Sequence, residues 1–432
     1  MSSRDYLIRP LEHTYSLEYP SFNIPFPYSD YPTLNVDIWK HGVKKRWGYI
    51  GDQTFADNIQ AVLTMRAKNG NKYLTYLTDK DLAVRETGTG KTYSYRTPVY
   101  ITGSVSSMNP GKTVVTGDGS TNWTTSTISV GDKFIIDSDD TSDVEEDTNW
   151  MTIKSIDGVH QITLDSAYTG SHTSGAYTIR KLYSVPSTER WSYAVTGGYL
   201  CFGNANINVQ YWDGSTTKAA DLDSTNAVGA KYMIEYDDRL CLLNTKISTV
   251  REPWTLKYSE LGDVTHWDVG TYPTAGEIDF IDTEDYGTGL GKVGGSLVVY
   301  KLHSFIVGHR TGISTAPFAF DVPRIGIGLL APNSLIHFMG TNAWLGNSDF
   351  YIMSGDEPMA IGEKIRFKFF DIVNGGNLEQ VWGFYDPPMN KLLWFATTED
   401  GQRCFCYDIK TAEWTTYSFW TTVTGGGMGL LI

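Results

Sequence analysis

Long apolar runs and cysteine are both scarce in this sequence of 432 residues. Nowhere do 18 apolar residues follow one another, so no membrane-spanning helix is expected. The N-terminal stretch "MSSRDYLIRPLEHTYSLEYP" has no apolar core of the signal-peptide type. The four cysteines are too few for a disulfide scaffold: Cys201, Cys241, Cys404 and Cys406. Cys404 and Cys406 lie two apart in "RCFCYDI", so they are expected to share one face of a strand as packed thiols, without further zinc ligands nearby. The low cysteine content and the lack of long apolar runs predict a protein that is made in a cytosol with its thiols reduced and that has no membrane span.

Positive charge is also in deficit. The chain has 35 Lys and Arg against 49 Asp and Glu, which gives a formal net charge of −14. Tight binding to phosphate backbones needs clustered cations, so this balance argues against a strong nucleic-acid binder. An acidic wall would still let DNA slide past without sticking, and net charge alone does not separate that role from ordinary solubility.

A phosphate-binding loop is suggested by "RETGTGKTY" (85–93) but fails on spacing. The P-loop needs a glycine five residues before Gly90, where this chain has Arg85. It also needs a helix after the lysine, whereas the β-rich stretch "TYSYRTPVYI" follows. We therefore interpret this segment as a hairpin loop, and no ATP or other cofactor is expected.

Aromatic and turn-forming residues are abundant: 13 Trp, 27 Tyr, 18 Phe and 43 Gly. This mixture favours strands and tight turns. Residues 1–56 are rich in Pro and Tyr and predict an extended N-terminal arm that lies along other surfaces. Residues 57–100 alternate like a β-meander and predict the first propeller strands. Residues 101–182 predict a small β-sandwich or barrel inserted between strands of a larger unit.

A loose repeat of strand, turn and strand follows in residues 183–432, with units that begin near 198, 239, 295, 334 and 381. A period of about 40 to 55 residues suits four-stranded propeller blades. The expected fold class is all-β: a β-propeller of about six blades, with five to seven left open. One segment, "MAIGEKIRFKFFDIV", places Ile361, Ile365 and Phe369 four residues apart and predicts a short helix packed on the propeller.

Two stretches suggest sites but are better explained as structure. "TGDGSTNW" (116–123) has Thr116, Asp118 and Trp123 at the offsets of an Asp-box turn, although Ser120 and Asn122 depart from it. The acidic run "DSDDTSDVEED" has Ser142 where a calcium loop needs Gly, so a solvated, self-repelling loop is expected. Its seven carboxylates are Asp137, Asp139, Asp140, Asp143, Glu145, Glu146 and Asp147.

Catalytic patterns are weak. His303 and His309 lie six apart without a metal-binding spacing, and no nucleophile-elbow motif occurs. A pair of catalytic carboxylates, as in a glycosidase, is still a possible interpretation, and Asp213, Asp238 and Asp263 lie near blade edges. However, each of them lies in a turn, where Asp is favoured in any case. Five tryptophans are candidates for stacking on sugars or for packing between blades: Trp123, Trp150, Trp212, Trp344 and Trp394. A carbohydrate-binding propeller is therefore the main alternative function, and a propeller glycosidase the second.

The blades resemble the β-propeller tail proteins of short-tailed bacteriophages, known as tail tubular protein B, tail nozzle or packaged-DNA stabilisation proteins. The likeness covers roughly residues 40–420. It is carried by "KKRWGYI" (44–50), "DRLCLLNTK…LKYSELGDVTHWD", "GGSLVVYKLHSFIVG", "IHFMGTNAWLGNSDFYIMSGDEPMAIGEKIR" and "YDPPMNKLLWFATTEDGQRCFCYDIKTAEWT". In addition, "VVTGDGSTNW…VGDKFII" looks like a small β-module of phage structural proteins.

The resemblance implies a virion component assembled in the host cytoplasm. Copies would form a ring, usually a hexamer, below the portal and adaptor, around a channel through which double-stranded DNA passes. The outer face would meet fibres or spikes. The family has no catalytic, cofactor or metal residues to carry over, so no enzyme is expected; which residues line the channel stays open.

Overall fold

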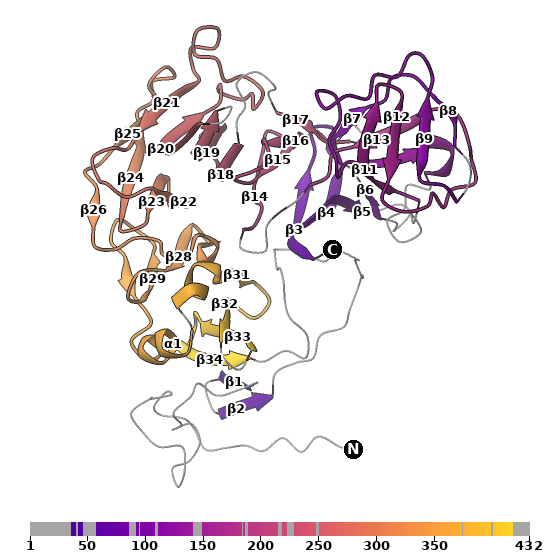
Figure 1. Cartoon of the computed structure of the whole chain (residues 1–432). Helices are drawn as coiled ribbons and strands as arrows, with labels where there is room; N and C mark the ends of the chain where they lie inside the picture. The colour runs from indigo at the N-terminus through magenta and orange to yellow at the C-terminus, as the bar shows by residue number, and fades with distance from the viewer. Residues whose placement is uncertain are drawn as a thin grey trace, which may run out of the picture. The chain divides into compact units, whose positions relative to one another are not determined.

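The computed structural model describes residues 36–39, 42–45, 58–85, 92–94, 96–108, 111–140, 149–183, 185, 189–214, 218–222, 229–247, 250–373, 375–398 and 401–417. The chain divides into two compact units (Figure 1). One contains residues 55–229 and 431–432 and is called the two-blade unit here. The other contains residues 1–54 and 230–430 and is called the four-blade unit. In the described part of the chain, no helix has the length and apolar character that crossing a membrane requires.

Six sheets share one pattern, in which strands consecutive in the chain are antiparallel neighbours. This meander is the pattern of a propeller blade. Two blades lie in the two-blade unit. Blade 1 contains β3 (Ile59–Arg66), β4 (Lys72–Thr78), β5 (Leu82–Arg85) and β6 (Thr92–Ser94), and blade 2 contains β14 (Ser192–Thr196), β15 (Tyr199–Gly203), β16 (Gln210–Trp212) and β17 (Ala220–Asp221).

The four-blade unit contains the other four. Blade 3 contains β18 (Gly229–Tyr236), β19 (Arg239–Ile247), β20 (Val250–Tyr258) and β21 (Gly276–Asp279). Blade 4 contains β22 (Gly287–Val293), β23 (Ser296–Lys301), β24 (Ser304–Arg310), β25 (Phe318–Phe320) and the short β26 (Arg324–Ile325). Blade 5 contains β27 (Ile336–Phe338), β28 (Thr341–Leu345), β29 (Phe350–Met353) and β30 (Met359–Ala360), and blade 6 contains β31 (Trp382–Asp386), β32 (Lys391–Thr398), β33 (Gly401–Asp408) and β34 (Glu413–Tyr417). The predicted fold class, an all-β propeller of about six blades, is confirmed.

Between blades 1 and 2 the chain forms a separate seven-stranded sheet in the order β7-β13-β10-β11-β12-β9-β8. Its strands are β7 (Pro98–Tyr100), β8 (Val105–Ser107), β9 (Val114–Gly117), β10 (Lys133–Ile136), β11 (Met151–Gly158), β12 (Gln161–Leu164) and β13 (Tyr177–Arg180), with the 3-10 helix η1 (Asp137–Asp139) after β10. An antiparallel bridge joins Val105 of β8 to Gly175, just before β13, so the two ends of the sheet meet. We call this inserted sheet the barrel.

Part of the predicted N-terminal arm forms a hairpin. β1 (Val36–Trp39) pairs with β2 (Gly42–Lys45) and lies alongside β34 of blade 6 (Figure 1). Residues 1–35 and 46–57 lie outside the described part of the chain.

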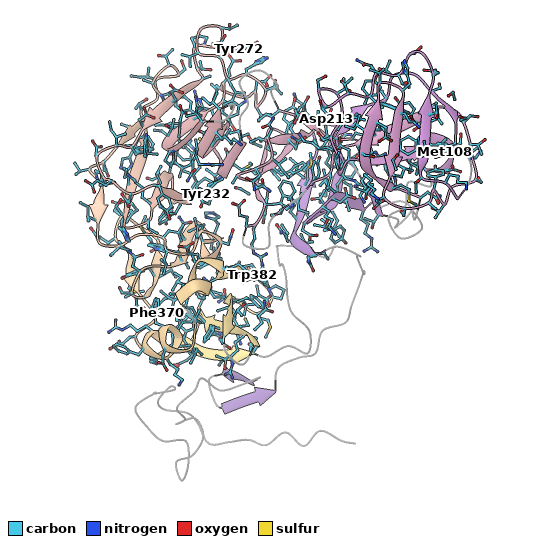
Figure 2. All side chains as sticks on the ribbon, viewed as in Figure 1. Met108, Asp213, Tyr232, Tyr272, Phe370 and Trp382 are labelled. Atoms are coloured by element: carbon cyan, nitrogen blue, oxygen red, sulfur yellow. The ribbon has the colours of Figure 1, made fainter. Side chains whose placement is uncertain are left out.

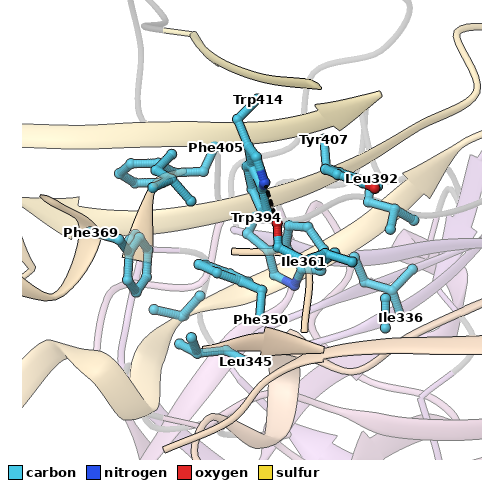
Figure 3. Close-up of a cluster of buried hydrophobic side chains, with 14 of the residues drawn as sticks. Ile336, Leu345, Phe350, Ile361, Phe369, Leu392, Trp394, Phe405, Tyr407 and Trp414 are labelled. Atoms are coloured by element: carbon cyan, nitrogen blue, oxygen red, sulfur yellow. Dashed lines mark hydrogen bonds between the residues drawn. The ribbon is translucent and has the colours of Figure 1, made fainter. Parts of the chain in front are cut away.

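Outside the barrel, most of the core lies between successive blades within each unit. Between blades 5 and 6, Phe350, Phe405, Trp394 and Trp414 pack together, and the Trp414 indole N–H donates to the Ile361 carbonyl at 2.8 Å (Figure 3). Similar clusters lie between blades 1 and 2, 3 and 4, and 4 and 5. The barrel has its own core.

The predicted helix is present as α1 (Arg366–Ile372). Ile361, Ile365 and Phe369 are all buried in the cluster between blades 5 and 6, as their four-residue spacing predicts. Two short 3-10 helices, η2 (Pro332–Ser334) and η3 (Gly375–Gln380), complete the connections around blade 5.

Candidate functional site

The candidate phosphate loop joins two strands of one hairpin. Arg85 of β5 is paired directly with Thr92 of β6, so a strand follows the lysine and no helix N-terminus is available for phosphate. Residues 86–91 themselves lie outside the described residues.

Four of the five tryptophans considered for sugar stacking or core packing are core residues. Trp123 and Trp344 are 0% exposed, as is Trp394, and Trp212 is 1% exposed. Their indole N–H groups are used inside the protein: Trp123 donates to the Tyr177 hydroxyl at 2.8 Å, and Trp344 donates to the Gly328 carbonyl at 3.1 Å. These four side chains pack the core and are not available for stacking on a sugar.

The candidate carboxylates lie in turns. Asp238 adopts φ 53° in the β18–β19 turn, and its carbonyl accepts the N–H of Gly262, so it lies close to Asp263. The Asp263 carboxylate accepts the Thr265 N–H at 2.8 Å and lies 3.7 Å from His266. Asp213 follows β16 in the two-blade unit (Figure 2). Asp238 and Asp263 are thus neighbours that shape turns.

The two histidines lie at opposite ends of β24. His303 Nδ1 contacts the Asn347 amide at 2.7 Å, and His309 Nε2 lies 3.2 Å from Asp321. Among the described residues, no group of three or more His, Cys, Asp or Glu side chains is arranged to hold a metal ion.

The Asp-box-like stretch is a structural turn in the barrel. Asp118 accepts the backbone N–H groups of Ser120 and Thr121 at 2.9 and 3.1 Å and that of Ser104 at 3.0 Å. The turn thereby fixes β8 to the end of β9, while Trp123 enters the barrel core.

The prediction of a solvated acidic loop is wrong for Asp139, which is buried. Its carboxylate accepts hydrogen bonds from the Tyr168 hydroxyl at 2.9 Å and the Ser171 N–H at 3.1 Å, and lies 2.6 Å from His172 Nδ1. Burial alone would raise the pKa of Asp139, but these hydrogen bonds outweigh it and hold the pKa at about 2. Asp139 therefore organises the 168–172 turn. Residues 141–148 of the acidic run lie outside the described residues.

All four cysteines are buried free thiols. Cys404 and Cys406 pack in one cluster with Trp382 and Phe395, as expected for neighbours on one strand face. Burial raises the pKa of the Cys201 and Cys241 thiols, which keeps them protonated.

A cluster of polar contacts attaches the barrel to blade 1, and the sequence did not predict it. We call the cluster of Arg96, Trp150 and Arg180 the joint. The Arg180 guanidinium of β13 donates to the Ser94 carbonyl of β6 at 3.1 Å and to Asp140 at 3.4 Å. The guanidinium groups of Arg180 and Arg96 lie over the Trp150 ring, 4.4 and 5.4 Å from its centroid. Both arginines are less than one-tenth exposed, so these charge-assisted contacts form away from water.

A second group of buried contacts fixes the two connections that enter and leave the barrel. The Thr97 hydroxyl donates to Gln210 of blade 2 at 2.6 Å and lies 2.8 Å from the Tyr183 hydroxyl. The Lys181 N–H donates to the Thr97 carbonyl at 2.9 Å. Because Thr97 precedes β7 and Tyr183 follows β13, the barrel is held at both ends of its insertion.

Buried cations brace the four-blade unit in the same way. The Lys301 ammonium is buried and donates to the carbonyls of Phe280 at 2.9 Å and Thr283 at 3.0 Å, and it lies 3.3 Å from Asp285. Burial would raise the pKa of Asp285, but hydrogen bonds from Thr283 and the His303 N–H, with Lys301 nearby, hold the pKa below its usual value. Lys301 thereby ties the β21–β22 connection to blade 4.

No family model and no curated protein matches this sequence. Solved structures with a similar chain path include the computationally designed Ika8 protein, with a TM-score of 0.36 and 11% identity, covering 85% of this chain and 90% of that one. Hsv2 of Kluyveromyces lactis has a TM-score of 0.32 and 8% identity, covering 84% and 97%. A putative exported protein of Bacteroides fragilis has a TM-score of 0.31 and 9% identity, covering 52% and 70%. The fold assignment rests on the strand pairings themselves.

Proposed function

We propose that this chain is a structural subunit of a bacteriophage tail. In this proposal copies assemble into a ring, with six as the expected number, below the portal and adaptor. The ring surrounds the path of double-stranded DNA, helps to retain packaged DNA and offers attachment surfaces to fibres or spikes. The role needs no catalysis and no cofactor. It rests on the resemblance of residues 40–420 to phage tail propellers, together with the propeller fold.

The observation that carries the proposal is the use of the chain's polar and aromatic side chains as internal bracing. The buried Arg239 side chain donates to the carbonyls of Asp237, Thr274 and Ser314, and Lys301 and Arg180 bind main-chain carbonyls in the same manner. Such buried charge-assisted contacts hold loops in one arrangement, and breaking them is costly. A braced propeller with few open strand edges suits a part of a tube that must keep its shape.

The alternative of a carbohydrate-binding propeller is weakened, since four of the five candidate tryptophans are in the core. The fifth, Trp150, has two guanidinium groups over its ring. No particular observation favours a glycosidase.

Negative-stain electron microscopy of the purified full-length chain tests the proposal. We expect ring-shaped particles with a central hole. Single-copy particles at every protein concentration, together with binding on a glycan array, would support the carbohydrate-binding alternative instead.

A further inference from the structure

Blades 3 and 4 carry a group of exposed apolar side chains where several strands end. The Phe280 N–H donates to the Trp254 carbonyl at 3.1 Å, which brings Ile281 next to Trp254. On blade 4, Ile325 is paired with Ser304, and the Ser304 hydroxyl lies 3.5 Å from that of Thr283 in the same β21–β22 connection. We call the exposed residues of this surface the rim: Trp254, Ile281, Tyr286 and Ile325.

The rim residues are well exposed. Ile281 is 69% and Ile325 77% exposed, while Trp254 is 42% and Tyr286 41% exposed. Together these side chains present on the order of 400 Å² of mainly apolar surface, a size at which exposed patches on monomers often function in binding. The buried Lys301–Asp285 pair fixes the connection that carries Ile281 and Tyr286, so the rim is preformed.

Acidic side chains are interleaved with the rim. Asp282 and Glu284 are both exposed, in the connection between Ile281 and Tyr286. Neither forms an ion pair with a described residue. A surface of apolar groups with unpaired carboxylates fits a partner that brings cations, because opposite charges steer association and fix register.

Blade 1 presents such cations at the β3–β4 turn. Arg66 and Lys72 are directly paired across the hairpin, and both are exposed. Like charges placed opposite each other destabilise a hairpin, and no carboxylate occurs in residues 59–78 to offset them. Lys68 lies in the same turn and donates to the Tyr199 hydroxyl of blade 2 at 3.0 Å. We call Arg66, Lys68 and Lys72 the basic tip.

We propose that the rim of one copy of this chain binds the basic tip of a second copy. The apolar side chains of the rim would be covered, and Asp282 and Glu284 would neutralise the Arg66–Lys72 pair. This inference rests on the proposed function insofar as both require self-assembly, and it adds the surfaces through which copies meet.

The two surfaces differ, so the contact is head-to-tail. A head-to-tail contact repeats from copy to copy and closes into a ring if the rotation allows. Each copy would then use its rim on one neighbour and its tip on the other, which predicts that the two surfaces can be inactivated separately.

Sedimentation velocity of full-length variants tests the surfaces. The rim variant Ile281→Asp/Ile325→Asp and the tip variant Arg66→Glu/Lys72→Glu are each expected to weaken association at least tenfold. The control for the rim is Ile313→Asp, an exposed apolar residue beyond the other end of β24. The control for the tip is Lys112→Glu/Lys154→Glu, two exposed lysines of the barrel. Both controls should assemble like the wild type, and unchanged thermal midpoints confirm folding.

Mixing the rim variant with the tip variant gives the decisive result. The rim variant keeps a working tip and the tip variant keeps a working rim, so an equimolar mixture is expected to form a species of two copies and nothing larger. A mixture that stays monomeric overturns the head-to-tail contact, as does a tip variant that still associates through two rims. If the wild type assembles and both variants assemble equally well, the proposed surfaces are wrong while the structural role stands. A wild type that is monomeric throughout contradicts both.

Discussion

At the scale of single residues, the tryptophans show how this chain uses its aromatic content. Trp394 lies between Phe350 and Trp414, with ring centroids 4.9 and 5.5 Å away, and its indole N–H donates to the Ser334 carbonyl at 2.9 Å. The side chain thus joins blade 6 to blade 5 and to the connection before it. The Trp394 side chain therefore contributes both to the packing of the core and to a buried hydrogen bond.

Replacing Trp394 with alanine should destabilise the four-blade unit by about 3–5 kcal/mol, since a large buried side chain leaves a cavity and an unpaired carbonyl. Chemical denaturation followed by circular dichroism measures the loss. Phe367→Ala is the matched control, because Phe367 is 74% exposed and lies outside the rim, and it should change stability by less than about 0.5 kcal/mol. Equal effects of the two substitutions would contradict the burial of Trp394.

Glu413 gives a residue-scale prediction about pH. Burial on β34 raises its pKa from 4.5 to about 7, although Lys364 lies 3.4 Å away and partly opposes the shift. Because the folded-state pKa lies above the unfolded one, the stabilisation from this group is complete below the unfolded pKa and is lost as pH rises through about 7.

The wild type should therefore have a lower thermal midpoint at about pH 8 than at about pH 5, and Glu413→Gln should reduce this difference. The control is Glu363→Gln, because Glu363 is exposed and directly precedes Lys364 in the sequence. If Glu413→Gln leaves the pH dependence of the midpoint as it was, Glu413 is not protonated in the folded protein near neutral pH.

At the scale of elements, the connection that leaves blade 4 packs closely on the β23–β24 turn of the same blade, and this contact depends on a small residue. Gly328 lies between β26 and β27, and a Cβ added there would come within 2.2 Å of the Leu302 carbonyl oxygen. That contact is with backbone, which cannot rotate away as a side chain can. The connection between blades 4 and 5 therefore requires glycine at this position.

Gly328→Ala is expected to destabilise the protein by about 1–3 kcal/mol through overpacking. Gly295→Ala provides a control of identical chemistry, since nothing lies within 4 Å of a Cβ built there. Thermal unfolding compares them. A Gly328→Ala protein as stable as Gly295→Ala would mean that Gly328 lies farther from the Leu302 carbonyl than described.

The barrel joint predicts a second element-scale effect. Arg180→Ala should remove the contacts of β13 with Ser94 and Asp140 and expose the two connections of the barrel. Hydrogen–deuterium exchange should become about tenfold faster in peptides that contain the Lys181 N–H, with the barrel core unchanged. Lys154→Ala, on the barrel surface, should show wild-type exchange; an Arg180→Ala protein that does the same would show that the joint does not hold the barrel.

The sequence revealed the elements better than the contacts between them. Alternating residues and turn residues predicted the blades, and the spacing of Ile361, Ile365 and Phe369 predicted α1, because each signal is local. The joint consists of Arg96, Trp150 and Arg180. Because these residues lie far apart in the chain, no periodic pattern in the sequence predicts that they meet. Asp139 was misjudged for a related reason: its partners Tyr168 and His172 come about 30 residues later, and without them an acidic run is expected to be solvated.

At the scale of the whole molecule, the chain is a braced propeller, and we propose that it functions through contacts with other copies and with other tail proteins. Buried cations fix its loops and core tryptophans join its blades; in the proposed tube, a formal charge of −14 would keep passing DNA from binding tightly to the wall. These features fit a subunit of a tube in which shape carries the function.

The native mass of the purified full-length chain tests this claim most directly. Mass photometry across a range of protein concentrations should show one closed assembly whose mass is an integral multiple of 48.2 kDa, with six copies as the expected number. A single species of 48.2 kDa at every concentration would contradict the account.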